Sequence, residues 1–146
     1  MQPTGKGMKK CIVISDSFKG TLSSMEICRI ARQSIPKFFP QCQVLTIPVA
    51  DGGEGTVDCF VEAIGAQPIQ VSVTGPLGEP VQAVYARKGN CAVIEMACAA
   101  GLPMVGEAKN PGQATTYGVG QVIAHAVERG CDEILLGLGG SATNDG

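Results

Sequence analysis

The chain has 146 residues, enough for one modest hydrophobic core or for one domain and the beginning of another. Hydrophobic residues make up 45% of the sequence and charged residues 16%, so an intrinsically disordered chain is excluded. The formal net charge of −2 provides no cationic field for nucleic acid or for an anionic membrane surface. We therefore expect a small molecule as the partner.

The seven cysteines indicate a reducing compartment. They are odd in number and widely spaced, with no Cys-x-x-Cys pair and only one histidine in the chain, so neither a disulfide framework nor structural zinc is predicted. No apolar run in the sequence approaches the ~20 residues that a membrane-spanning helix needs. These features favour a cytoplasmic protein and leave its oligomeric state open.

The first predicted unit is a strand, a loop and a helix. Residues 1–7 are interpreted as an N-terminal extension, and the β-branched run at residues 11–14 predicts a buried strand. Ser23 and Glu26 have the spacing of a capping box at the start of a helix. Apolar residues then recur at helical intervals until Pro36 and Pro40, which we expect to stop the helix.

The same unit then repeats along the chain. Residues 44–47 predict a second strand, residues 51–56 a glycine-rich loop, and residues 57–64 a helix that ends at Gly65. This alternation of strands and helices predicts an α/β fold, with a parallel Rossmann-like sheet flanked by helices.

Beyond residue 69 the pattern changes. Short apolar runs at residues 71–74, 81–85 and 92–94 are separated by turns, which favours antiparallel strands. Helical spacing returns over residues 119–127, where His125 lies off the apolar stripe and is expected to face solvent, and a last strand follows at 132–136. We predict a Rossmann-like domain over residues 8–76 and the truncated beginning of a second α/β domain, with short antiparallel strands, over residues 77–146.

Glycines and polar residues follow three of the predicted strands, at residues 16–19, 51–56 and 137–145. Loops of this kind share one edge of an open parallel sheet, and that edge is where ligands bind. We expect the three loops to converge on one anion-binding site.

The residue types in the first two loops suit phosphate or carboxylate chemistry, although each has a structural alternative. Lys19 either supplies a point charge to an anion or is simply solvated, and Asp16 with Ser17 either serves the site or caps the following helix. The carboxylates of Asp51 and Glu54 suit Mg²⁺, or acceptance of a proton from a substrate hydroxyl. The metal ligands remain unassigned beyond these two candidates.

The last loop fits two kinds of site. Residues 137–142 match the glycine pattern of dinucleotide-binding proteins, although the acidic residue expected ~20 positions later lies beyond the last residue. Its glycines also allow backbone amides to approach a phosphate.

Two further features of the sequence stay open between a structural and a functional role. They are Glu95 at a predicted strand end and Thr115 or Thr116 ahead of a helix, where N-capping is favoured for one threonine.

Six ordered blocks of the sequence together resemble the bacterial glycerate kinase family of the glyoxylate and glucarate pathways. The blocks are DSFKG at 16–20, ADGGEGT at 50–56, VTGPLG at 73–78, IEMA at 94–97, ATTYG at 114–118 and GLGGSATNDG at 137–146. The resemblance extends from about residue 9 to the last residue.

This resemblance implies transfer of the ATP γ-phosphoryl group to a hydroxyl of D-glycerate with Mg²⁺, and 2-phosphoglycerate is favoured over 3-phosphoglycerate as the product. Members of the family have two α/β domains with the active site between them, and they extend well beyond the length of this chain. The resemblance therefore implies an N-terminal fragment whose own activity is open. The alternatives are a nicotinamide-dependent oxidoreductase, or a non-catalytic fragment or interaction module.

The loop chemistry and the resemblance together define a predicted site. The predicted catalytic residues are Asp16, Lys19 and Asp51. The predicted substrate and phosphate contacts are Ser17, Gly52, Gly53, Glu54, Gly139, Gly140, Ser141, Asn144 and Asp145.

Overall fold

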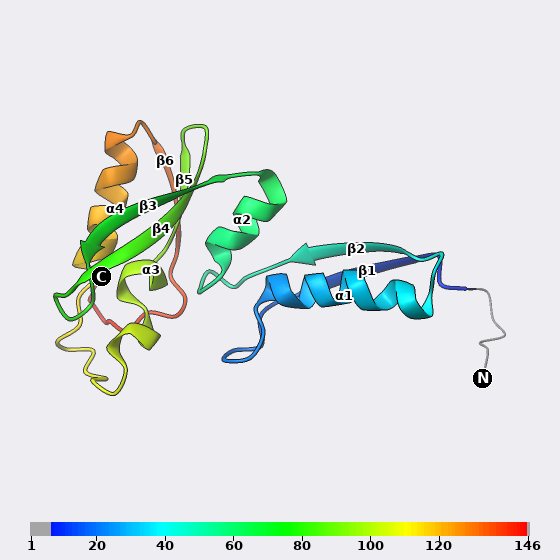
Figure 1. Ribbon diagram of the computed structural model, residues 1–146. Coiled ribbons are helices and arrows are strands. Elements are labelled where there is room, and N and C mark those ends of the chain that lie inside the picture. The colour runs from blue at the N-terminus through cyan, green and yellow to red at the C-terminus, as the bar shows by residue number, and fades with distance from the viewer. Residues whose placement is uncertain (1–6, 146) are drawn as a thin grey trace. The chain divides into compact units, whose positions relative to one another are not determined.

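The computed structural model describes residues 7–145. The chain divides into two compact units, Met1–Ala50 and Asp51–Gly146. Each unit has its own sheet, with one helix in the first unit and several helices in the second (Figure 1). The α/β fold expected from the sequence is confirmed.

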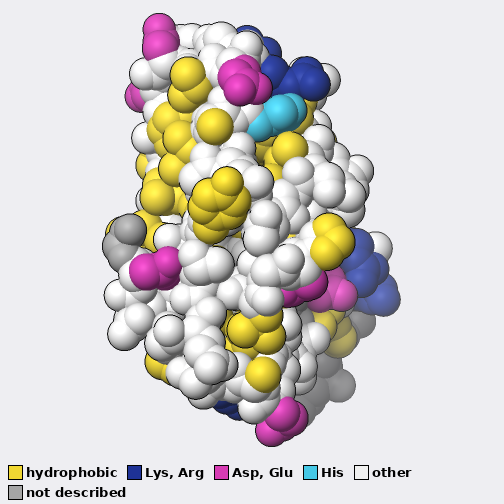
Figure 2. Space-filling model, turned by 90° about the vertical axis from the view of Figure 1, so that its left-hand side faces the viewer, with side chains coloured by type: hydrophobic (Ala, Val, Ile, Leu, Met, Phe, Trp, Pro, Cys, Tyr) yellow, Lys and Arg dark blue, Asp and Glu magenta, His cyan; other side chains and the backbone are white. Residues whose placement is uncertain are grey.

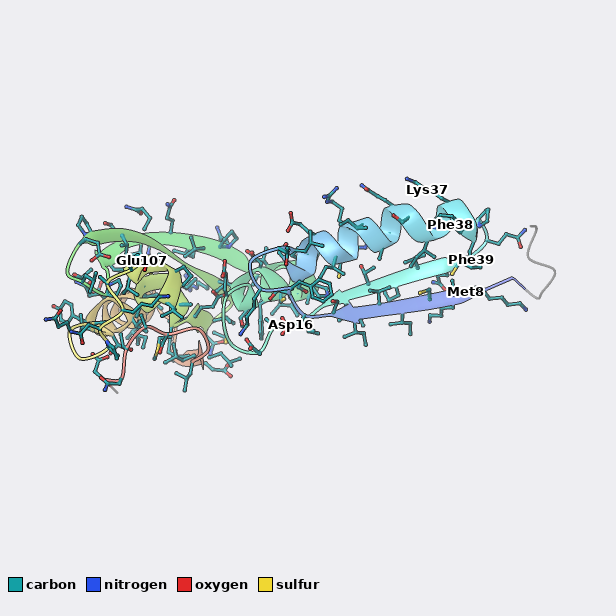
Figure 3. All side chains as sticks on the ribbon, turned by 90° about the horizontal axis from the view of Figure 1, so that it is seen from below. Met8, Asp16, Lys37, Phe38, Phe39 and Glu107 are labelled. Carbon is teal, nitrogen blue, oxygen red and sulfur yellow. The ribbon has the colours of Figure 1, made fainter. Side chains whose placement is uncertain are left out.

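The first unit contains a parallel strand pair and one helix. Its elements are β1 (Lys10–Ser15), α1 (Ser24–Phe38) and β2 (Gln43–Pro48). β1 and β2 pair in parallel, with Ile12 opposite Leu45, as the strand–helix–strand pattern predicts. Side chains alternate between the two faces, and the sticks of β1 and β2 that point away from α1 are visible in Figure 3. That outer face exposes apolar side chains, namely Ile12, Ile14, Leu45 and Ile47.

The start of α1 is fixed by the predicted capping box. The Ser23 side chain accepts a hydrogen bond from the Glu26 amide at 3.1 Å, and the Ser23 amide donates to the Glu26 carboxylate at 2.8 Å. α1 ends at Phe38, between the two prolines that were expected to stop it, and Pro36 lies inside its last turn. A proline has a backbone angle that fits a helix and removes only one of its hydrogen bonds, so the last turn still forms here.

The second unit is a four-stranded mixed sheet with helices. Its elements are α2 (Thr56–Ile64), β3 (Gln67–Thr74), β4 (Pro80–Lys88), β5 (Cys91–Glu95), α3 (Ala97–Ala100), the 3₁₀ turn η1 (Leu102–Val105), α4 (Tyr117–Glu128) and β6 (Glu133–Gly137). The strand order is β3-β4-β5-β6. The first two pairings are antiparallel, as expected for the short strands, and β5 pairs with β6 in parallel.

Helices cover both faces of this sheet. Tyr85 and Ile94 form a core with α3 and α4 on one face, whereas Ala86 and Val93 pack against α2 on the other. Successive strand residues point to opposite faces, so Glu95 lies on the same face of β5 as Val93. Its carboxylate is therefore directed toward α2. The domain boundary expected between residues 76 and 77 stays a prediction.

His125 does not simply face solvent, so this expectation is wrong. Its ring packs edge-on against Tyr85 with the ring centroids 5.8 Å apart, and the Tyr85 hydroxyl lies 3.3 Å from His125 Nδ1. On its outer side the imidazole accepts a hydrogen bond from Arg129 Nε at 3.0 Å. Figure 2 shows the chain's single histidine at the surface beside basic side chains. His125 is thus half-buried and lies at the edge of the apolar face of α4, in contact with Tyr85.

Candidate functional site

Two of the three predicted loops are in direct contact. We call residues 51–56 the Asp51 loop and residues 137–145 the Gly139 loop. The Gly139 amide donates a hydrogen bond to the Gly52 carbonyl at 3.0 Å. A Cβ atom at Gly137 would overlap the Gly52 carbonyl oxygen, and one at Gly139 would lie 2.7 Å from the Gly53 nitrogen. Glycine is therefore required at positions 137 and 139 for this close approach of the two backbones.

The Asp51 loop is a tight turn that leads into α2. The Gly53 amide donates to the Asp51 carboxylate at 2.9 Å, and the Thr56 hydroxyl donates to the Gly53 carbonyl at 2.8 Å. Gly52 has a φ of 92°, a backbone conformation that favours glycine. The side chains of Asp51 and Glu54 are exposed. Both predicted carboxylates are thus accessible to a ligand.

Glu95 has a structural role that the sequence left open. Its side chain is only 7% exposed, and it accepts a hydrogen bond from the Val57 amide at 2.5 Å. Val57 lies in the first turn of α2, where the amides have no partner within the helix. Burial raises the pKa of Glu95 above its ordinary value of 4.5, and the Val57 hydrogen bond opposes that shift. Glu95 therefore caps α2 from the end of β5.

The first turn of α4 is also capped from within the chain. The Thr116 amide donates to the Asp145 carboxylate at 2.8 Å, and this hydrogen bond lowers the pKa of Asp145. Thr116 is the N-cap residue, but its side chain makes no capping hydrogen bond, so the N-capping expected of one threonine side chain is not observed. The Tyr117 amide instead donates to the Thr115 hydroxyl, one residue before the N-cap, at 3.1 Å. Asp145, predicted as a substrate contact, here binds the helix, and Asn144 beside it is exposed.

The Gly139 loop is hydrogen-bonded to the segment where α3 ends and η1 begins. The Leu102 amide donates to the Gly140 carbonyl and the Ala142 amide to the Ala100 carbonyl, both at 2.8 Å. Residues 138–145 form no helix, so the strand–glycine loop–helix arrangement of a dinucleotide-binding motif is not completed within them. Of the three amides predicted to bind an anion, at Gly139, Gly140 and Ser141, that of Gly139 donates to the Gly52 carbonyl, so those of Gly140 and Ser141 remain as candidates.

The third predicted loop, residues 16–19, belongs to the other compact unit. Asp16 follows β1 at the opposite end of that unit from Phe38 and Phe39 (Figure 3). Its carboxylate accepts a hydrogen bond from the Ser17 amide at 2.7 Å, and the Lys19 side chain is exposed. The convergence of this loop with the other two stays a prediction.

Ser24 is a residue that the sequence reasoning missed. Its buried hydroxyl donates to the Ser15 carbonyl at 2.7 Å and accepts from the Val49 amide at 3.0 Å. It thereby joins the first turn of α1 to the carboxyl ends of β1 and β2. The signal available in the sequence was its place next to the N-cap, which does not by itself reveal contacts 9 and 25 residues away.

The candidate metal ligands fit magnesium better than zinc. Within residues 7–145, no three His, Cys, Asp or Glu side chains cluster to hold an ion. Two exposed carboxylates in one loop, Asp51 and Glu54, match the Mg²⁺ sites that take few protein ligands and complete the shell with phosphates and water.

None of the seven cysteines forms a disulfide. Burial raises the pKa of Cys98 to about 12, so its thiol remains protonated and is not a nucleophile.

Known proteins closely match this chain. The model of the glycerate kinase family covers residues 11–146. The chain belongs to the glycerate kinase family. The glycerate kinase of Bacillus cereus is 46% identical over 140 residues, and the glycerate 2-kinase of Escherichia coli K12 is 42% identical over 140 residues. Both alignments span 94% of this chain and 37% of the relative.

One solved structure is similar to this chain in both fold and sequence. A crystal structure described as a glycerate kinase 2 from Salmonella typhimurium LT2 matches with a TM-score of 0.77 and 44% identity, over 94% of this chain and 38% of that one. This family membership favours the kinase over the nicotinamide-dependent oxidoreductase. None of the helices described between Gly7 and Asp145 has the length and apolar composition of a membrane-spanning helix.

Proposed function

We propose that this chain supplies the N-terminal part of an ATP- and Mg²⁺-dependent kinase that phosphorylates D-glycerate. The observation that carries the proposal is the hydrogen bond between the Gly139 amide and the Gly52 carbonyl. It joins the Asp51 loop, which carries two carboxylates, to the Gly139 loop, whose glycines expose backbone amides. Phosphoryl transfer needs both kinds of group in one place, because carboxylates hold the metal or accept the proton and amides bind the phosphates.

The anion contacts in this proposal are backbone amides and one lysine. The first turn of α2 cannot offer the Val57 amide to a phosphate, because Glu95 accepts its hydrogen bond. The amides of Gly140 and Ser141 lie in the glycine-rich turn and suit a phosphate or the substrate carboxylate. Lys19 would add a point charge from the loop after β1.

The carboxylates would handle the proton and the metal. In the transfer step, the glycerate hydroxyl oxygen bonds to the γ-phosphorus, the bond from that phosphorus to the β,γ-bridging oxygen breaks, and ADP leaves. Asp16 or Asp51 would accept the hydroxyl proton, and both are exposed at loop positions. Asp51 and Glu54 would hold Mg²⁺, which neutralises charge on the phosphates.

The product is proposed to be 2-phosphoglycerate. The support is the name of one relative, the glycerate 2-kinase of Escherichia coli K12, which is 42% identical over the aligned residues. The choice between the two hydroxyls depends on substrate placement. The chain spans 37% of the length of that relative. A cytoplasmic location is also proposed, since the seven cysteines form no disulfide.

The test uses a fusion in which residues 1–146 replace the matching N-terminal segment of the Bacillus cereus relative. With D-glycerate, ATP and Mg²⁺, NMR of the product should show phosphate on the 2-hydroxyl. Asp51→Ala and Lys19→Ala, made separately, should each lower kcat/KM by about 100-fold or more, by analogy with the loss of electrostatic stabilisation in other enzymes.

Two matched variants control for general effects of lost charge. Lys37→Ala removes an exposed lysine near the end of α1, and Glu107→Ala removes an exposed carboxylate after η1 (Figure 3). Both should keep the rate of the parent. Near-normal rates in both Asp51→Ala and Lys19→Ala would overturn the site assignment, and absence of phosphoglycerate from a folded parent fusion would overturn the function.

A further inference from the structure

Glu95 is the one buried acidic side chain within residues 7–145. It is 7% exposed and lies at the last position of β5. A carboxylate in such a place loses hydration and needs hydrogen bonds in return. The nearby ionisable groups give no compensation, because Asp58 and Glu54 repel its negative charge and Cys98 of α3 is a protonated thiol. Its favourable partners are backbone amides.

The partner amide belongs to a helix that has no capping side chain of its own. The N-cap of α2 is Gly55, which makes no side-chain cap hydrogen bond, and the Thr56 hydroxyl donates to the Gly53 carbonyl instead. The Val57 amide is thus satisfied by a residue 38 positions away in the sequence. Since α2 begins where the Asp51 loop ends, Glu95 fixes the end of that loop to the sheet.

The same strand position also faces the Gly139 loop. Glu95 is the register partner of Gly137 on β6, and the next amide, that of Met96, donates to the Gly137 carbonyl at 2.8 Å. The Asp51 loop is consequently attached at two points. Its middle is bonded to Gly139 through the Gly52 carbonyl, and its end is bonded to Glu95 through the first turn of α2.

We propose that Glu95 is a positioning residue whose carboxylate, by accepting the Val57 amide, sets the placement of the Asp51 loop against the Gly139 loop. The catalytic consequence rests on the proposed function, since it requires these two loops to form the kinase site. The structural consequence, which is the placement of one loop against the other, does not rest on the proposed function. Glu95 does not contact substrate in this role. It keeps Asp51 and the amides of Gly140 and Ser141 in the geometry that transfer needs.

The first test measures amide hydrogen exchange by NMR in the 146-residue chain, with no ligand. In Glu95→Ala, the amides of Val57 and Gly139 should exchange about 10-fold faster or more, while that of Val122 in α4 stays unchanged. Glu95→Gln keeps an oxygen acceptor of the same length and should restore the protection. Unchanged exchange at Gly139 in Glu95→Ala would overturn the proposal.

A shorter acid keeps the test decisive if the alanine variant does not fold. Glu95→Asp retains the carboxylate but withdraws it by one methylene group, so Val57 and Gly139 should again lose protection. Full protection of both amides in Glu95→Asp would contradict the positioning role.

The second test uses the fusion with the Bacillus cereus relative. Glu95→Ala should raise KM for D-glycerate and lower kcat by about 10- to 100-fold, and Glu95→Gln should recover most of both. A purely structural loss would reduce the amount of active enzyme and leave KM unchanged. If the parent fusion makes no phosphoglycerate, the kinase proposal fails while the exchange experiment still decides the positioning. If the parent is active and Glu95→Ala matches it, the positioning role in catalysis fails.

Discussion

The Gly139 amide and the Gly52 carbonyl form a 3.0 Å hydrogen bond between two loops that are far apart in the sequence. The contact leaves no room for a side chain, because a Cβ atom on Gly139 would lie 2.7 Å from the Gly53 nitrogen and 2.9 Å from its Cα. The two loops are therefore coupled through backbone atoms, which cannot move aside as a flexible side chain can.

Gly139→Ala should accordingly destabilise the second unit by about 2 kcal/mol or more, because the loops must separate to admit the methyl group. Urea unfolding followed by circular dichroism measures this. The matched control is Gly112→Ala, a loop glycine whose nearest neighbour to an added Cβ is the Asn110 side chain at 3.4 Å. Equal stabilities of the two variants would contradict the tight contact.

Two glycines of α4 should respond in opposite directions to the same substitution. A Cβ on Gly118 would overlap the Thr74 carbonyl oxygen at the end of β3, whereas one on Gly120 meets nothing within 4 Å. Gly118→Ala should cost about 1–3 kcal/mol, and Gly120→Ala should add about 1 kcal/mol from the higher helix propensity of alanine. Thermal unfolding of both variants in one buffer tests the packing of α4 on the sheet, and a stabilising Gly118→Ala would refute it.

Ser24→Ala should weaken the first unit. It removes the hydroxyl that joins Ser15 and Val49, and the Val49 amide retains only a longer hydrogen bond of 3.3 Å to the Ser15 carbonyl. We expect a loss of about 1–3 kcal/mol in the free energy of unfolding. Ser72→Ala, on an exposed position of β3, should change stability by less than about 0.5 kcal/mol. Indistinguishable effects would mean that the Ser24 hydroxyl does not link these elements.

The pH dependence of stability should reveal the burial of Glu95. Because burial raises its pKa in the folded state, the folded chain binds the proton more tightly than the unfolded chain. Its contribution is fully present below the ordinary value of 4.5 and is lost as the pH rises through the raised pKa. The stability of Glu95→Gln relative to the parent should therefore increase between about pH 4 and pH 7. A difference that is constant with pH would show that the pKa is not raised.

The pH dependence of stability that comes from Asp145 should have the opposite sign to that of Glu95. The Thr116 amide lowers its pKa, so the unfolded chain binds the proton more tightly, and the stabilising contribution is present above the ordinary value of 3.8. It is lost as the pH falls through the lowered pKa. Asp145→Asn should be less stable than the parent at pH 7, and the two should become equal in acid. The measurement is the difference in urea midpoint across this range, and a gap that widens in acid would contradict the cap.

The amino-acid sequence by itself determined the features that depend on neighbouring residues. The run at residues 11–14 predicted β1, the Ser23 and Glu26 pair predicted the start of α1, and Gly65 marked the end of α2. These follow from side-chain alternation, helical periodicity and capping, which act over a few residues. The six ordered blocks predicted the family in the same way, because they can be recognised without knowing which of them touch.

The tertiary structure alone decided which distant groups meet. Glu95 was open between two roles until the register of β5 with β6 and the packing of α2 brought its carboxylate to the Val57 amide. His125 departed from expectation for a similar reason, since the environment of a ring depends on packing as well as on its place in the helical pattern. Register and packing are set by the whole sheet, so no local pattern encodes the contact between Gly52 and Gly139 that makes two of the three predicted loops neighbours.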